Sequence, residues 1–589
     1  WNNGAKNRRR IECDIKFMFI KSLTIKNFRC FNKDGITADL NKGLTAFIGR
    51  NGSGKTSILE ALNFLIGHDY LPTRISEKDF HNEAKEIKDE ISIEGETESP
   101  FFITLDVRSS TNQLETIIIP CNKIRLTIKR REKPEKVLDD PFIINKYVVP
   151  VVGDIDEGIF KAEEKARKAS RINQIKEGYT VFYKLKDGQE RDAKVIGYQL
   201  TYNPSRLTNC PKAYYLTKDR DDDVSGNYSL ISKILTDLHW KYKKKHTAGD
   251  GATIQGEYDT LAGSLRSIVD EKGALIRGIN EKVKSICSDD KDFQIDFIDI
   301  DQPYKSAFVA KKEGDKLLLP DNLGSGFNIL IAYALFAYVA ELEKIPIVLI
   351  VDEPELHLHS DWQKKMYDVF TKQTNLQIVY STQSENFISL KNWRQIRLIK
   401  DSQIFPKPSG GEQIQATDGE TGTPAEYLDD YASRNLHIST ILRENLELFF
   451  TKKCVLVEGP SEKYALPKLL ELSGCDIEEF SVSIITAWGK TKIKNYQMIC
   501  KVFDVDYFTL FDQDKAEDDE PETENSAIES NAQTGKIAKF STSFEAKLGI
   551  TGEGKFQKLV KIIDEVTGTG SLDQEIKDTL ASLKTFIES

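Results

Sequence analysis

One segment constrains the fold of this chain more than any other, the run Gly49-Arg50-Asn51-Gly52-Ser53-Gly54-Lys55-Thr56. It fits the pattern G-x-x-x-x-G-K-[ST], follows the apolar run Leu44–Ile48 and opens the apolar stretch Thr56–Ile66. Glycines let backbone N–H groups turn inward around phosphates, while the lysine reaches the outer phosphates and the threonine hydroxyl binds Mg²⁺. The dipole of a helix that begins there adds positive potential. The pattern predicts a strand–turn–helix nucleotide clamp in an α/β fold; an ordinary glycine-rich turn is the alternative.

A buried strand that ends in two acids supports the nucleotide clamp. The run Ile345–Val351 is apolar and is followed directly by Asp352 and Glu353. Alone, such a pattern is typical of an ordinary strand end. In a chain that also has the phosphate-binding loop (P-loop) at 49–56, the first acid would complete the Mg²⁺ shell and the second would orient or activate water. The nucleotide-site residues predicted from these two segments are Asn51, Gly52, Gly54, Lys55, Thr56, Ser57, Asp352 and Glu353.

Length and composition narrow the class of protein. The chain has 589 residues, which suggests several domains, and its 82 basic and 92 acidic residues give a net charge of −10. That balance argues against a generally basic DNA coat but leaves room for local basic grooves. The longest apolar run, Ile329–Ala340, is shorter than the roughly 18 residues that a membrane span needs, so we expect a buried helix. Eight scattered cysteines without a C-x-x-C pair indicate a reducing cytoplasm.

The pattern of apolar runs predicts two α/β domains. Residues 1–17 are polar and basic, and we expect them to be an unnatural or alternative leader, which we set apart from the fold. Residues 18–425 are assigned to an ATPase domain with a helical insert at about 225–290, which is a dimerisation arm or a plain packed subdomain. Residues 426–589 form the second α/β domain. Within it, the acidic segment 515–535 is low in apolar residues and is expected to be disordered.

A second group of acids follows two strands of the later domain. Glu458 ends the apolar run Cys454–Val457, and Asp512 and Asp514 end the run Tyr507–Phe511. Adjacent parallel strands would bring these carboxylates to one edge, where they repel unless a cation neutralises them. Hard oxygen ligands suit Mg²⁺, Mn²⁺ or Ca²⁺. We therefore predict a metal site, with exposed acids that merely cap strands as the alternative.

The first domain resembles a known class of ATPase. Residues Ile25–Ile66, with Asn27-Phe28-Arg29, resemble the heads of the RecF, SMC and Rad50 class of ABC proteins. The resemblance implies that Leu323–Gly326, with Ser325, is the signature motif that caps ATP bound by the other head of a dimer. The stretch Asp352–His359 resembles the Walker B and D-loop region of that class. The class therefore implies ATP-dependent head dimerisation.

One position departs from that class. The run Ser381-Thr382-Gln383-Ser384 lies where the class carries Ser-Thr-His-Ser, whose histidine contacts the γ-phosphate. Gln383 can donate an amide hydrogen bond to phosphate, but it cannot carry a proton as imidazole does. We therefore expect slow or altered ATP turnover, with Gln383 in the nucleotide site.

The second domain resembles the Toprim fold of topoisomerases, primases and several nucleases. Topoisomerases and primases carry Asp-x-Asp-x-Asp, whereas the third position here is Ala516. A glutamate one turn after the first, here Glu462, is typical of OLD (overcoming lysogenization defect) family nucleases, as is an ABC head before the Toprim domain. The Gabija nuclease belongs to the same group and resembles this chain in the string Glu-Gly-Pro-Ser-Glu-Lys at 458–463. The resemblance covers most of residues 18–560.

The family implies further residues after the acidic segment. Phe544-Glu545 resembles its late metal-binding glutamate, and Lys555 resembles its late catalytic lysine, which stabilises phosphate charge. Lys547 is the competing choice for that lysine. Lys490, after Trp488-Gly489, is a candidate contact to the DNA backbone, although we expect an ordinary surface lysine.

The mechanism that the family implies is two-metal phosphodiester hydrolysis. One ion, held by Glu458, Glu462 and Asp512, would activate water. A second ion, near Asp514 and Glu545, would stabilise the leaving oxygen. The catalytic residues that this resemblance implies are Glu353, Glu458, Glu462, Asp512, Asp514, Glu545 and Lys555.

We therefore expect an α/β protein in which an ABC (RecF/SMC-like) ATPase head with a helical dimerisation insert precedes a Toprim domain. The function expected is an ATP-binding, Mg²⁺- or Mn²⁺-dependent DNA endonuclease in the cytoplasm; its role in antiphage defence rests on family resemblance alone. The resemblance implies a dimer or tetramer that forms through the ATPase heads and the helical insert. A partner protein of a defence system, or a small nucleic acid, is a further partner that the sequence leaves open. The alternatives are a RecF-like repair or clamp ATPase, and a partner-dependent sensor whose Toprim unit binds DNA without cutting it.

Overall fold

The computed structural model covers the chain in separate stretches. The residues that the structure describes are 18–67, 71–108, 114–132, 140–150, 155–156, 180–186, 190–196, 200–202, 204–217, 274–286, 293–297, 307–313, 316–318, 329–337, 346–356, 358–407, 414–415, 421–434, 443–513, 521–550, 552, 554–566 and 568–589. The predicted leader, most of the helical insert, Leu323–Gly326 and Asp514 lie outside these residues.

Two compact units divide the chain. The first comprises Trp1–Phe47 and Gly54–Thr382, and the second comprises Ile48–Ser53 and Gln383–Ser589. The domain boundary predicted at 425/426 stays a prediction.

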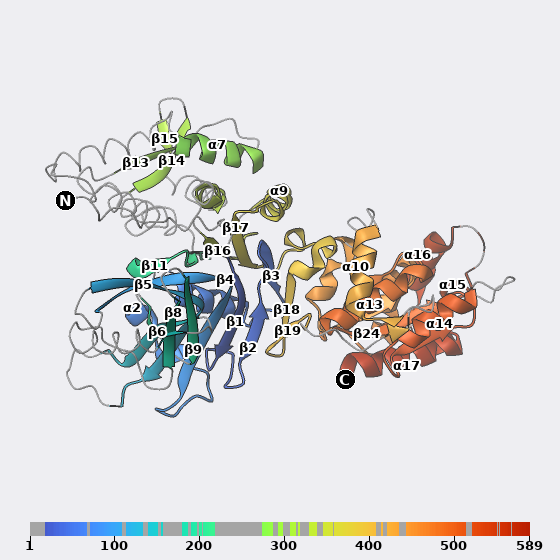
Figure 1. Ribbon diagram of the computed structural model, residues 1–589. Coiled ribbons are helices and arrows are strands. Elements are labelled where there is room, and N and C mark those ends of the chain that lie inside the picture. Colours follow the sequence, from blue (N-terminus) through green and yellow to red (C-terminus); the bar gives the residue numbers. More distant parts are fainter. Residues whose placement is uncertain are drawn as a thin grey trace. The chain divides into compact units, whose positions relative to one another are not determined.

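Parallel strands form the centre of the first unit (Figure 1). They run in the order β12 (Lys212–Leu216), β16 (Ile347–Asp352), β17 (Leu376–Ser381) and β3 (Leu44–Ile48). All residues of β16 and β17 are buried, which is usual for a parallel strand covered on both faces. Because parallel strands end at one edge, Asp352 pairs in register with Ser381.

An antiparallel sheet packs on the same unit through helix α1 (Lys55–Ile66), which contacts both sheets. Its strands follow the order β10-β6-β5-β4-β1-β2, with β11 paired to β4. Their bounds are β1 Ile20–Lys26, β2 Ile36–Asp39, β4 Glu90–Arg108, β5 Leu114–Arg130, β6 Phe142–Pro150, β10 Leu200–Thr201 and β11 Leu207–Thr208. The remaining elements of this unit are α2 Leu71–Arg74, β7 Ile155–Asp156, β8 Thr180–Lys186, β9 Glu190–Ile196, α7 Ala274–Ile286, β13 Phe293–Phe297, β14 Ala307–Glu313, β15 Lys316–Leu318 and α9 Ser360–Thr371.

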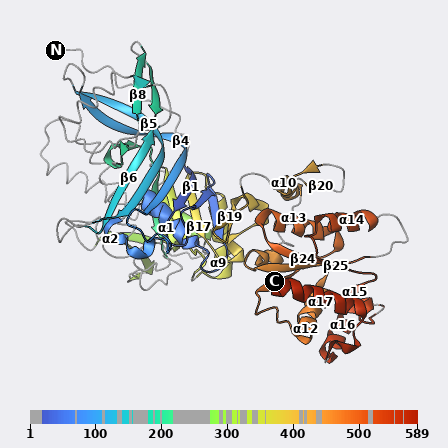
Figure 2. The same ribbon diagram turned by 90° about the horizontal axis from the view of Figure 1, so that it is seen from below.

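The second unit is built on four parallel strands in the order β23-β22-β24-β25. Their bounds are β22 Lys453–Val457, β23 Val482–Thr486, β24 Asp506–Asp512 and β25 Ile537–Phe540. Helices α13 and α14 cover one face, and α12, α15, α16 and α17 cover the other (Figure 2). The helices are α10 Pro424–Arg434, α12 Pro460–Leu472, α13 Ile493–Phe503, α14 Pro521–Asn531, α15 Phe544–Lys547, α16 Lys555–Glu565 and α17 Gln574–Glu588. Two hairpins, β18 Ile396–Lys400 with β19 Gln403–Phe405 and β20 Ile414–Gln415 with β21 Thr421–Gly422, complete the unit.

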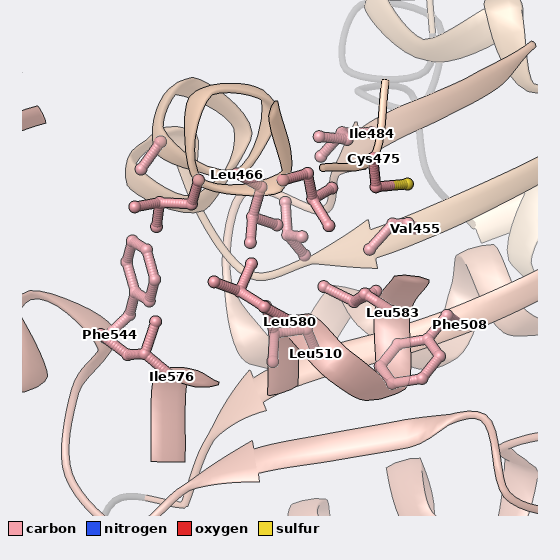
Figure 3. Close-up of a cluster of buried hydrophobic side chains, with 14 of the residues drawn as sticks. Val455, Leu466, Cys475, Ile484, Phe508, Leu510, Phe544, Ile576, Leu580 and Leu583 are labelled. Atoms are coloured by element: carbon pink, nitrogen blue, oxygen red, sulfur yellow. The ribbon is translucent and has the colours of Figure 1, made fainter. Parts of the chain in front are cut away.

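The core of the second unit explains why β24 reads as one continuous apolar run. Phe508 and Leu510 face a cluster that includes Leu466 of α12 and Leu580 of α17 (Figure 3). The alternate residue Thr509 faces α13, where its hydroxyl is bonded to Gln497 at 3.1 Å. Side chains alternate across a strand, so a strand covered by helices on both faces must be apolar at nearly every position.

The strands predicted at both sites are confirmed within one or two residues. The prediction of disorder across 515–535 is wrong over residues 521–535, and its first part, 515–520, lies outside the described residues. Within that segment, Pro521–Asn531 forms helix α14, with Ala527 and Ile528 buried. Its few apolar residues fall on the face toward α13, so a composition average conceals them.

The apolar run Ile329–Ala340 agrees with the predicted buried helix over its described part. Residues 329–337 are helical, and every one is buried. In the described stretches of chain, no helix combines the length and the apolar character that a bilayer crossing requires.

Candidate functional site

The P-loop follows β3 and leads into α1, as predicted. Gly49, Gly52 and Gly54 all adopt positive φ angles, of 137°, 79° and 104°. At Gly54 a Cβ atom would lie 2.6 Å from the Cys30 sulfur and 2.8 Å from the Phe31 ring. Glycine is therefore required there for both conformation and space. The turn can present its N–H groups to phosphates because these glycines allow it.

Asp352 lies at the centre of a compact hydrogen-bonded group in the first unit. It is the last residue of β16 and is buried. The Thr56 hydroxyl donates to its Oδ2 atom at 3.1 Å, and the Ser381 hydroxyl donates to its Oδ1 atom. Thr56 lies in the first turn of α1, and Ser381 ends β17. The helix α1 and the strands β16 and β17 therefore place two hydroxyl groups on one carboxylate. These are the oxygens that a P-loop ATPase presents to Mg²⁺.

The same strand edge orients Glu353. Its backbone has a left-handed φ of 50°, and its N–H donates to both the Ser381 hydroxyl and the Ser381 carbonyl at 3.1 Å. A non-glycine residue with positive φ needs a surrounding structure that holds it. The next residues extend the network, because the Thr382 hydroxyl donates to Glu355 at 2.9 Å. Gln383 follows at once with an exposed side chain.

The other predicted nucleotide residues differ in exposure. Asn51 and Gly52 are exposed, whereas Lys55 is buried. The Ser57 side chain is hydrogen-bonded to the Cys30 thiol. Ser325 lies outside the described residues. The role of Ser381 beside Asp352 was missed from the sequence, although its place at the end of a predicted strand was a usable signal.

A second site lies at the carboxyl edge of the sheet in the second unit. Glu458 follows β22, and its Oε2 atom accepts the backbone N–H of Asp512 at 3.4 Å. Asp512 ends β24, and its Oδ1 atom accepts the backbone N–H of Phe544 at 3.0 Å. The strand ends and the late Phe544-Glu545 segment are therefore joined at one edge, as the order of the predicted strands requires.

Helices α12 and α15 add Glu462 and Glu545 to this edge. The Ser461 hydroxyl donates to Glu545 Oε1 at 2.7 Å, and the Gly459 N–H donates to Glu462 Oε2 at 3.1 Å. Ser461 lies within the Glu-Gly-Pro-Ser-Glu string, but its contact with a residue 84 positions later was missed because it depends on tertiary structure. Hydrogen bonds from backbone N–H groups and from the Ser461 hydroxyl thus hold four predicted acids at this edge, Glu458, Glu462, Asp512 and Glu545.

The pKa of Glu462 is shifted by its surroundings. Its side chain is 4% exposed, at the first turn of α12. Burial, with the negative charges of Asp512, Glu545 and Glu458, raises the pKa of Glu462 to about 8. A carboxyl group with this pKa holds a proton at neutral pH unless a cation replaces it. Buried titratable groups with strongly shifted pKa values are typical of functional sites.

The donor set fits a hard divalent ion, because it consists of carboxylate and hydroxyl oxygens. Across the stretches of chain that the structure describes, no three acid, histidine or cysteine side chains form a preformed metal cage. Asp514 and the Lys555 side chain lie outside those stretches. The competing Lys547 is ion-paired with Glu575, with 3.1 Å between Nζ and Oε1.

The expectation that Lys490 is an ordinary surface lysine is wrong. Its ammonium nitrogen is shielded from solvent and lies 5.7 Å from the centre of the Phe511 ring. Phe511 is the residue before Asp512 in β24.

Six cysteines fall in the described residues, and all six are free thiols.

Comparison with known proteins agrees with the two types of domain predicted from the sequence. The model of the AAA ATPase domain family matches residues 18–388, and that of the Overcoming lysogenization defect protein-like TOPRIM domain matches residues 449–514. The OLD nuclease of Thermus scotoductus is 23% identical over 568 residues, which cover 90% of this chain and 92% of the relative. The Old nuclease of Escherichia phage P2 is 23% identical over 84% of this chain and 77% of its own length. Endonuclease GajA of Bacillus cereus is 23% identical over 77% of this chain and 68% of its own length.

The order of the two matched domains is the one that the sequence predicted. The P-loop and Asp352 fall within the first match, and Glu458, Glu462 and Asp512 fall within the second. The chain therefore belongs to the AAA ATPase domain family and continues into an OLD-like TOPRIM domain, the arrangement predicted from its resemblance to OLD-family nucleases.

Proposed function

We propose that this chain is an ATP-regulated, metal-dependent endonuclease that cleaves DNA. One observation carries the proposal: Glu462 is buried among three other acids, beside the ends of β22 and β24, with its pKa raised to about 8 by burial and by those charges. Such a cluster is unfavourable in a metal-free protein and favourable around divalent ions. Three nuclease relatives along most of the chain support the same activity.

The contacts of four acids at the sheet edge support the ligand sets that the family resemblance implies. We assign one ion to Glu458, Glu462 and Asp512, and a second to Asp514 and Glu545. Bound Mg²⁺ or Mn²⁺, or Ca²⁺ as a further candidate, would generate hydroxide near neutral pH and stabilise the leaving oxygen. Glu458, Glu462, Asp512 and Glu545 come together at the carboxyl edge of one sheet, where two ions could act on a single phosphodiester.

The surrounding residues hold the acids for this reaction. The Phe544 N–H orients Asp512, the Gly459 N–H orients Glu462, and the Ser461 hydroxyl orients Glu545. Contacts of this kind fix carboxylate ligands and tune their basicity. Lys555 is assigned to the phosphate charge, since the competing Lys547 is already paired with Glu575.

The roles of the residues at the nucleotide site are assigned in the same way. Lys55 reaches the outer phosphates of ATP, Thr56 and Asp352 belong to the Mg²⁺ shell, and Glu353 orients water. Gln383 donates its amide to the γ-phosphate. Ser325 of a second copy caps the nucleotide, so the ATP-bound form is a homo-oligomer, a dimer or tetramer, that also uses the helical insert. We place the protein in the cytoplasm and assign it a role in antiphage defence. A partner protein of the defence system or a small nucleic acid is a further candidate ligand.

Plasmid nicking tests the proposal directly. Supercoiled plasmid is incubated with the full chain and Mg²⁺, Mn²⁺ or Ca²⁺, with ATP titrated into each reaction. We expect nicked and linear products with Mg²⁺ or Mn²⁺, and none with EDTA. Glu458→Gln should remove cleavage and retain ATP binding. Plasmid that stays intact under every metal and ATP condition, while ATP is hydrolysed, would instead favour a DNA-binding clamp ATPase.

A further inference from the structure

A short loop beside the acidic edge carries an exposed aromatic residue. Trp488 follows β23 and is 48% exposed, the highest exposure of any aromatic residue in the described part of the chain. A single exposed apolar side chain is common on protein surfaces. Exposure alone says nothing of a ligand, so the argument depends on the position, conformation and charge of this loop.

Two hydrogen bonds fix the loop to the strand that carries Glu458. The Ala487 N–H donates to the Val457 carbonyl at 2.8 Å, and the Gly489 N–H donates to the Glu458 carbonyl at 2.9 Å. Trp488 lies between these two anchored residues. The backbone at Trp488 is therefore anchored to the end of β22 and to Glu458, beside the acidic edge.

The conformation of the loop is unusual for its sequence. Trp488 adopts a left-handed φ of 58°, and Gly489 follows with a φ of 123°. A bulky residue in the left-handed region is strained, and such strain persists where a side chain must be held in one direction. Glycine would fit position 488 without strain, so folding alone does not account for tryptophan there.

The chain segment that carries Trp488 is basic. Residues 481–503 contain Lys490, Lys492, Lys494 and Lys501 and no acidic residue. The Lys490 ammonium is shielded from solvent, 5.7 Å from the centre of the Phe511 ring, so the phosphate contacts are assigned to its neighbours in this segment. Lysines beside an exposed aromatic ring match a nucleic acid strand, since the cations neutralise phosphates and the ring stacks on a base.

We propose that Trp488 stacks on an unstacked nucleobase of the DNA strand that enters the acidic site. This inference rests on the proposed nuclease function and specifies its substrate: a strand whose base next to the cut is single-stranded, frayed or flipped. A base inside an intact duplex offers no free face to an indole, so the loop favours unpaired DNA over duplex DNA.

Binding to two matched oligonucleotides tests the inference. The full chain carries Glu458→Gln so that bound DNA stays intact, and anisotropy is measured with fluorescein-labelled dT15 and with an abasic backbone of the same length. Trp488→Ala should weaken binding to dT15 about tenfold and leave binding to the abasic strand unchanged. Trp488→Phe should restore most of the affinity, because a benzyl ring also stacks.

A matched variant guards against general surface effects. Tyr464 is 40% exposed in the same unit, but its ring packs against Phe556 with centroids 5.8 Å apart. Tyr464→Ala should leave dT15 binding unchanged, and Trp488→Ala should keep the thermal midpoint of the parent. Equal losses with both oligonucleotides, no loss with either, or an equal loss in Tyr464→Ala would overturn the role of Trp488.

Plasmid nicking separates this inference from the proposed function. If the wild-type chain nicks DNA and Trp488→Ala binds dT15 as tightly as its parent, the nuclease assignment stands and the stacking inference is wrong. If the wild-type chain nicks nothing under any metal condition, the nuclease assignment is wrong, whatever the binding data show.

Discussion

The two units each end a buried parallel strand in an aspartate, and the surroundings of the two aspartates differ. Asp352, at the end of β16, receives hydrogen bonds from the hydroxyls of Thr56 and Ser381. Asp512, at the end of β24, lies among other acids and receives a backbone N–H from Phe544. The same strand geometry thus supports a hydroxyl-bonded carboxylate in one unit and a cluster of carboxylates in the other.

The difference indicates what each site needs from a ligand. A single carboxylate with two hydroxyls needs one cation that also contacts a phosphate, which is the arrangement of an ATPase. A cluster of four acids carries excess negative charge, which metal ions neutralise before a phosphodiester approaches. The strand end positions the acid, and the neighbouring residues decide its chemistry.

The largest expected effect comes from removing each aspartate in turn. Asp512→Asn should lower DNA cleavage by at least about a thousandfold and leave ATP hydrolysis intact, because a metal ligand supplies several kcal/mol in the transition state. Asp352→Asn should remove ATP hydrolysis and leave the metal-binding acids of the second unit unaltered. Plasmid nicking and phosphate release measure the two activities.

A matched control lies on the same strand as Asp512. Asp506 begins β24 and is ion-paired with Lys536 at 3.3 Å, at the opposite end of the strand. Asp506→Asn should retain cleavage within about twofold, because exposed ion pairs contribute little to stability. Cleavage that survives in Asp512→Asn would end the assignment of the acidic edge as the nuclease site.

The next effect is a dependence of metal affinity on pH. With its pKa raised to about 8 by burial and neighbouring charges, Glu462 is protonated in the metal-free protein below that pH. An ion must displace this proton, so the apparent Mn²⁺ affinity should rise about tenfold per pH unit between pH 6 and 8 and then level off. Calorimetry at several pH values measures both the affinity and the released proton.

The sign of the stability effect follows from the same shift. The pKa of Glu462 is raised from its ordinary value of 4.5 to about 8 in the folded chain, so the stability that its protonated form contributes is lost as the pH rises between these two values. Without metal, the melting temperature of the wild type should therefore fall as the pH rises toward 8, and that of Glu462→Gln should fall less. Glu471→Gln, on the same helix and exposed, is the control. Identical pH profiles for Glu462→Gln and wild type would contradict the assignment.

Sequence patterns predicted the parts of the fold that depend on local periodicity and on the order of strands. Glu458, Asp512 and Asp352 were found because each ends a continuous apolar run, and such runs form the central strands of parallel sheets. Glu545 was placed only through family resemblance, because its contact with Ser461 joins residues 84 positions apart.

The parts that were missed depend on tertiary packing. The segment containing α14 was expected to be disordered because it has few apolar residues, such as Ala527 and Ile528, among many polar ones. Burial of these two side chains against α13 stabilises the helix. Lys490 was expected on the surface, because no sequence pattern shows that its ammonium lies beside Phe511. Ser381 was part of a recognised string, but its bond to Asp352 depends on the pairing of β16 with β17.

A smaller effect tests whether Ser381 orients Asp352 for Mg²⁺. Ser381→Ala removes the hydroxyl that donates to Asp352 and accepts the N–H of Glu353. We expect ATP hydrolysis to fall about tenfold, within the range for residues that orient a metal ligand. Ser389→Ala, whose hydroxyl caps no helix, should hydrolyse ATP at the wild-type rate. DNA cleavage without ATP should be equal in all three proteins.

The smallest effect concerns Gln383, where this chain departs from its class. An amide donates a hydrogen bond to the γ-phosphate but cannot accept or carry a proton as imidazole does, so Gln383→His should raise the rate of ATP hydrolysis severalfold. The increase should be largest near pH 7, where an imidazole with an ordinary pKa of about 6.5 is mostly neutral. An unchanged rate across pH 6 to 8 would show that turnover is limited elsewhere, and ATP would then act in this chain through binding more than through hydrolysis.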